Sequence, residues 1–143
     1  MKTEKKTMKT EKAVALYNLL KGLKVGKLKG EMQYAVLRNA RALKSVATSF
    51  EDFLSDARER LKPGEFEEVI EKFNRFDTLE EGEKQEVNRI IMDYQKRVDE
   101  CVHEELEREQ EIDPLTALDD EALTALSAGN ELTVEQLLTL SEM

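Results

Sequence analysis

A sevenfold repeat of apolar residues is the feature that most constrains the fold of this chain. Over residues 31–62 apolar side chains recur at alternating spacings of four and three; the series is Val36, Ala40, Leu43, Ala47, Phe50, Leu54, Ala57 and Leu61. This spacing is that of an a/d seam along one face of an α-helix. Pro63 and Gly64 follow directly and end the helix. At about 1.5 Å per residue, the helix is expected to be on the order of 45 Å long.

A second seam of the same period follows within residues 83–111. Its members are Val87, Ile91, Tyr94, Val98 and Cys101. Two long seams joined by a short segment, with a small helix at about 66–73, predict an antiparallel helical hairpin within one molecule. No stretch alternates at period two over the length of a strand, so the predicted fold class is all-α. The same seams would also serve a homo-oligomer, and the sequence leaves that alternative open.

Three segments differ in composition. Residues 1–11 contain the string MKTEK twice and are expected to be a flexible leader. Residues 12–112 are the predicted helical core domain, which opens with a short helix at about 13–23. Residues 113–143 form a leucine-rich tail with two short helices, the second opened by a capping-box pattern at Thr133. Because such short helices are marginal alone, the tail is expected to dock on the long pair, bind a partner or fluctuate.

The charge is divided unevenly along the chain. Residues 1–50 carry 12 Lys and Arg against 3 acids, and residues 51–143 carry 10 against 28. Internal pairing of the two halves is the favoured explanation, because the basic half lacks the interleaved aromatic residues of single-strand binders. Two alternatives stay open: an acidic DNA mimic, and a nucleic-acid-associated regulator. The regulator would use the basic residues Lys21, Lys24, Lys27, Lys29, Arg38 and Arg41.

The sequence predicts neither a membrane span nor secretion. Uninterrupted apolar runs are only a few residues long, whereas a bilayer requires about 20. The apolar run at residues 13–20 is interrupted by Asn18 and lacks a small-residue cleavage site after it. The expected location is the host cytosol or a virion.

The chain contains few groups that could perform chemistry. Its one histidine, His103, follows Glu100 at the E-x-x-H spacing of di-iron bundles, but those sites require a second such histidine. The string at residues 67–71 fits the E-E-x-x-E string of all-α nucleotide pyrophosphatases, but the E-x-x-D string that this family also requires is missing. Cys101, the one cysteine, is expected to act as a small apolar residue. We therefore predict a non-enzymatic protein with no metal, no cofactor and no catalytic residue.

One string is more specific than generic helical sequence. Residues 27–39 read KLKGEMQYAVLRN, which lies at the head of the long helix, and the chain closes with LTVEQLLTL at residues 132–140. In these features the chain resembles a family of small helical phage and prophage proteins of unknown function, encoded among virion and tail genes. The resemblance covers most of residues 12–142. It implies an accessory or assembly protein and supplies no catalytic residue.

The predicted function is therefore protein–protein interaction, with a virion or tail component as one expected partner. The candidate interaction surface combines polar residues near the start of the long helix with leucines of the tail. Its members are Lys27, Lys29, Arg38, Asn39, Arg41, Leu132, Leu137, Leu138 and Leu140.

Overall fold

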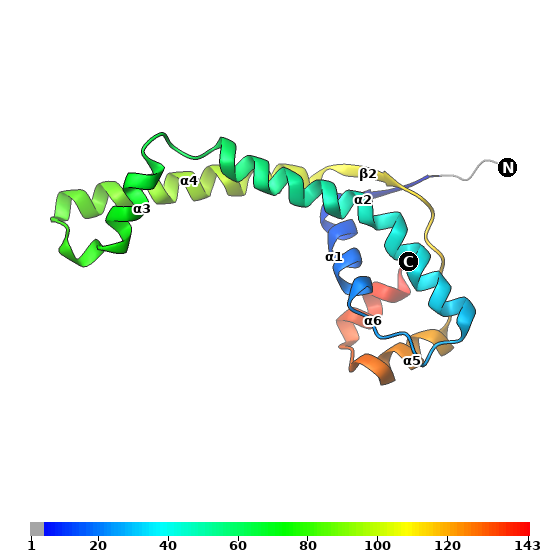
Figure 1. Ribbon diagram of the computed structural model, residues 1–143. Coiled ribbons are helices and arrows are strands. Elements are labelled where there is room, and N and C mark those ends of the chain that lie inside the picture. The colour runs from blue at the N-terminus through cyan, green and yellow to red at the C-terminus, as the bar shows by residue number, and fades with distance from the viewer. Residues whose placement is uncertain (1–4) are drawn as a thin grey trace. The chain divides into compact units, whose positions relative to one another are not determined.

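The computed structural model describes residues 5–143, which form six α-helices, one short 3-10 helix and a two-stranded ribbon (Figure 1). The predicted all-α class is confirmed, since the only strands in the described part are four residues long each. No helix among these residues is long and apolar enough to cross a membrane. The chain divides into two compact units: unit 2 comprises Glu51–Glu105, and unit 1 contains the flanking segments up to Phe50 and from Leu106.

Unit 1 is built from both ends of the chain. Its elements are β1 (Lys6–Lys9), α1 (Thr10–Lys21), the first part of α2 (Gly30–Arg60), β2 (Glu109–Ile112), α5 (Asp120–Asn130) and α6 (Val134–Ser141). Its core includes Leu16 of α1, Leu43 of α2, Leu126 of α5 and Leu140 of α6, each at most 1% exposed. The tail is therefore docked, and its leucines belong to the same core as the N-terminal helices.

The ribbon is the main departure from the predicted elements. Strands β1 and β2 pair antiparallel, with Met8 opposite Gln110 and Lys9 opposite Glu109. Residues 6–9 were expected in a flexible leader, and residues 109–111 at the end of a helix; both predictions were wrong. Each strand buries one apolar side chain, Met8 or Ile112, in the core of unit 1. Thr10 and Glu11 of the predicted leader belong to α1 (Thr10–Lys21), and residues 1–4 lie outside the described residues.

Unit 2 contains the helical hairpin. It comprises the last part of α2, α3 (Phe66–Asn74), the 3-10 helix η1 (Phe76–Thr78) and α4 (Glu81–Glu107) up to residue 105. Within this unit α2 and α4 run antiparallel, as predicted (Figure 1). The Tyr94 hydroxyl of α4 donates a 2.6 Å hydrogen bond to the Arg58 carbonyl of α2. The Tyr94 ring also contacts Phe66 of α3, with ring centroids 5.1 Å apart.

The heptad seam of α2 is divided between the two units. Its first half, including Val36 and Leu43, belongs to the core of unit 1 together with α1 and the tail helices. In its second half Ala57 is buried in unit 2. A heptad repeat specifies which face of a helix is apolar and leaves the partner of that face open. The domain division consequently differs from the predicted one at residues 12–112 and 113–143, because the tail completes the N-terminal core.

Candidate functional site

The described residues bring together no cluster that resembles a metal centre. Among residues 5–143 no group of three or more His, Cys, Asp or Glu side chains could hold a metal ion. His103 is exposed on α4. Cys101 is half-buried, and its Sγ accepts a long hydrogen bond of 3.6 Å from the Arg60 guanidinium.

An open apolar groove of about 660 Å³ lies between α5 and α6 in unit 1. Its walls are lined by Asp120, Leu123, Thr124, Ser127, Ala128, Val134, Leu137, Leu138 and Ser141. Val134 is 73% exposed and Leu138 is 58% exposed, which places them among the most exposed large apolar side chains of the described residues. Apolar area of this kind, at the mouth of a groove, is typical of an interaction site.

The two helices that form the groove are fixed at their N-termini by side-chain caps. The Asp119 carboxylate accepts a 2.7 Å hydrogen bond from the Ala122 N–H at the start of α5. At the start of α6 the predicted capping box is present. The Thr133 hydroxyl accepts from the Gln136 N–H at 3.1 Å, and the Gln136 side chain accepts from the Thr133 N–H at 2.9 Å. Such caps satisfy backbone N–H groups that a helix leaves unpaired.

Two asparagines tie the tail to the rest of unit 1. Asn39 is 1% exposed, and its amide both donates to the Thr116 carbonyl at 2.8 Å and accepts from the Thr116 N–H at 2.7 Å. Asn130, at the end of α5, makes the same two-way contact with the backbone of Lys24, at 2.9 and 2.7 Å. The groove therefore lies on helices whose positions within the unit are fixed on several sides.

The structure divides the predicted interaction surface into three groups. Asn39 and Leu140 were wrongly placed on it, because both are buried in unit 1, and Leu132 packs against the same core. Leu137 and Leu138 line the groove. The four basic residues are all exposed: Lys27, Lys29, Arg38 and Arg41.

A second surface of unit 1 carries basic and apolar side chains on one face of α2. Tyr34 is 52% exposed, Leu37 is 43% exposed, and the Arg38 guanidinium lies 5.0 Å from the centre of the Tyr34 ring. Arg41 and Lys44 continue this face along the helix. We call these five residues the α2 face. Sequence reasoning selected only its arginines, although the spacing of residues 34, 37, 38 and 41 could have revealed it.

Ion pairs within unit 1 join the basic N-terminal half to the acidic C-terminal half. They are Lys5–Asp113 at 2.6 Å, Lys9–Glu107 at 2.8 Å, Lys29–Glu121 at 3.2 Å and Lys12–Glu142 at 3.9 Å. The hydrogen bond to Asp113, and then the charge of that carboxylate, raises the pKa of Lys5 above its usual 10.5. Internal pairing thus accounts for part of the charge asymmetry. Within the described residues Arg38, Arg41 and Lys44 take no part in it.

A further hollow of about 640 Å³ between α1 and α6 has a more polar lining. Asn130, one of its lining residues, already uses its amide on the backbone of Lys24 and Leu126. The α5–α6 groove is the better candidate, since most of its exposed surface is apolar and gains most from being covered.

Comparison with known proteins adds no relative to this description. No family model, no curated protein and no solved structure matches the chain.

Proposed function

We propose that this chain is a non-enzymatic interaction protein that binds an α-helix of a partner protein in the groove between α5 and α6. The observation that carries the proposal is the exposure of Val134 and Leu138 at the mouth of that groove. These residues are four positions apart, so they lie on one side of α6 and can contact a single helix.

The expected binding energy is moderate. Full burial of a Val or Leu side chain contributes about 1.5–3 kcal/mol, so covering the exposed parts of these two contributes roughly 1–2 kcal/mol each. A helix laid in such a groove would present apolar residues at i, i+3, i+4 and i+7. Because the groove helices are capped and tied to the core, little ordering cost is expected on the side of this protein.

The biological setting we propose is that of a phage or prophage accessory or assembly protein. The support is the resemblance at residues 27–39 and 132–140 described above. In that setting the partner is a virion or tail component, and neighbouring genes for such components would strengthen the proposal.

Site-specific photocrosslinking in cells that carry the gene tests the use of the groove. A benzophenone amino acid replaces Thr124, which lines the groove, and in a matched control it replaces the exposed Asn88 of α4. We expect one defined adduct from position 124, none from position 88, and loss of the adduct on addition of Leu138→Asp. Adducts from both positions, or adducts that survive Leu138→Asp, would contradict the proposal. Far-UV circular dichroism checks that the variants remain folded.

A further inference from the structure

The groove belongs to an acidic segment of the chain, and one exposed acid, Asp120, lines it. Residues 113–143 contain no Lys or Arg and seven acids: Asp113, Asp119, Asp120, Glu121, Glu131, Glu135 and Glu142. Three of them pair with lysines of the N-terminal half, and Asp119 caps α5. Within residues 5–143 the other three are exposed and have no ion pair. Asp120 lines the groove, whereas Glu131 and Glu135 line the hollow between α1 and α6. An occupant with apolar residues that cover the lining and a positive charge beside Asp120 therefore fits this groove.

The α2 face has that combination. Two exposed apolar side chains, Tyr34 and Leu37, are followed by three cations, and the only acid in residues 30–50 is Glu31. The three cations are exposed and take no part in the ion pairs of the described residues. The residues are spaced as one side of a helix, which is the geometry a helix-binding groove accepts.

We propose that the occupant of the groove is the α2 face of a second copy of this chain. This inference rests on the proposed function, because it names the partner of the same groove. Tyr34 and Leu37 of one copy cover Val134 and Leu138 of the next, and Arg38 and Arg41 approach Asp120 in the groove lining. The ion pairs inside unit 1 already match basic N-terminal residues with acidic C-terminal ones, and the contact between copies repeats that match.

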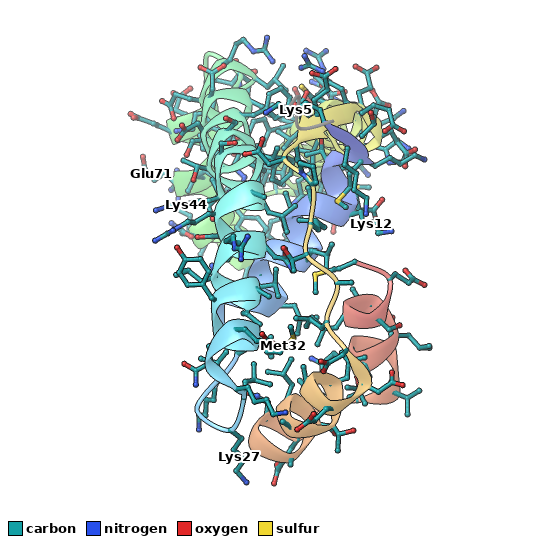
Figure 2. The ribbon with its side chains drawn as sticks, turned by 90° about the vertical axis from the view of Figure 1, so that its right-hand side faces the viewer. Lys5, Lys12, Lys27, Met32, Lys44 and Glu71 are labelled. Atoms are coloured by element: carbon teal, nitrogen blue, oxygen red, sulfur yellow. The ribbon has the colours of Figure 1, made fainter. Side chains whose placement is uncertain are left out.

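The arrangement within unit 1 determines the kind of assembly. In Figure 2 Lys44, which belongs to the α2 face, projects from α2 on the side away from α5 and α6. A molecule therefore cannot fill its own groove with its own α2 face. The contact joins two different surfaces, so each added copy leaves one free groove and one free face. Such heterologous contacts build open chains or closed rings.

The contact is expected to be weak and sensitive to salt. Both surfaces are small and exposed, and charges on them are screened over about 10 Å at 0.1 M ionic strength. In sedimentation velocity of the full chain we expect an average mass that rises with protein concentration in about 50 mM NaCl. The apparent dissociation constant should increase at least several-fold in about 500 mM NaCl.

Variants of the two surfaces provide the decisive test. Leu138→Ser disables the groove, and the pair Arg38→Glu and Arg41→Glu disables the α2 face. Each variant alone should sediment as a monomer, with at least a ten-fold loss of self-association. Mixed together they should form a one-to-one heterodimer that does not grow, because only one functional groove and one functional face meet.

A charge control separates this contact from general electrostatics. Arg58→Glu with Lys96→Glu makes the same change of charge on exposed residues of unit 2, and self-association should be retained. Wild-type protein that stays monomeric, a dimer that does not grow, or unchanged association of Leu138→Ser would each overturn the inference. If the wild type is monomeric but position 124 crosslinks to a different polypeptide, the groove function stands and only the second copy is excluded. If the wild type is monomeric and position 124 gives no adduct, both proposals are contradicted.

Discussion

Docking of the tail in unit 1 can be tested by truncating one leucine of α5. Leu126 is fully buried in the core that also contains α1 and the first part of α2. Leu138 of α6 belongs to the same tail and is 58% exposed. Leu126→Ala and Leu138→Ala therefore remove the same atoms from a buried and an exposed position, and the second variant is a matched control for the first.

The expected magnitudes differ clearly. Leu→Ala at fully buried positions costs about 3 kcal/mol, because transfer energy is lost and a cavity remains. A change of about 3 kcal/mol lowers the ratio of folded to unfolded protein on the order of 100-fold, which is a large part of the stability of a small domain. At exposed positions substitutions stay within about 0.5 kcal/mol, so Leu138→Ala should be close to neutral.

Amide hydrogen exchange is the appropriate assay, because it reports on the two units separately. In Leu126→Ala the amides of α1 and α5 should lose protection, while those of α4 within unit 2 should keep it. A urea titration followed by circular dichroism gives the accompanying change in midpoint. If Leu126→Ala changes protection no more than Leu138→Ala does, the tail is not part of this core, and the account of unit 1 is refuted.

Three further predictions concern single contacts in unit 1. Asn39→Ala should lower the free energy of unfolding of the unit by about 2–4 kcal/mol, because the N–H and the carbonyl of Thr116 both lose their partner. Urea unfolding measures this change. An effect below about 1 kcal/mol would show that the contact is dispensable. Glu131 is the C-cap of α5 and has a φ of 52°, a left-handed conformation that favours glycine. Glu131→Gly should therefore raise the thermal unfolding midpoint by the equivalent of about 1 kcal/mol. A lower midpoint would contradict this. The pKa of Lys5 is raised, so the stability that this shift contributes is fully present from neutral pH to about 10.5 and is lost as the pH rises through the folded-state pKa. An NMR titration should show the Lys5 pKa return toward 10.5 in Asp113→Asn, and an unchanged value would exclude Asp113 as the cause.

Local patterns predicted the helices well. The sevenfold seam predicted a helix over residues 31–62, and α2 spans Gly30–Arg60. The capping box at Thr133 was also predicted and is present. These features depend on neighbours three to seven positions apart, and such neighbours can be read from the sequence.

Contacts between distant segments could not be predicted in this way. Each strand of the ribbon is four residues long and buries one apolar side chain. A strand of this length is too short to show an alternating pattern in the sequence. Asn39 was placed on the surface because it is polar, and the carbonyl it binds is 77 residues away. α5 continues to Asn130, whose side-chain amide bonds to the backbone of Lys24, 106 residues away.

The division of the α2 seam bears on the function we propose. Over residues 30–50 the heptad seam of α2 is buried, since Val36, Leu43 and their neighbours pack in the core of unit 1. Tyr34 and Leu37 lie outside that core and remain 52% and 43% exposed, so folding of the unit does not account for them. Two surfaces are costly for a protein that acts alone: the exposed apolar groups beside cations on α2, and the apolar groove beside the unpaired Asp120. Contact between the groove of one copy and the α2 face of another would bury both surfaces. The helical hairpin, which is the feature that the sequence predicts most clearly, explains neither surface.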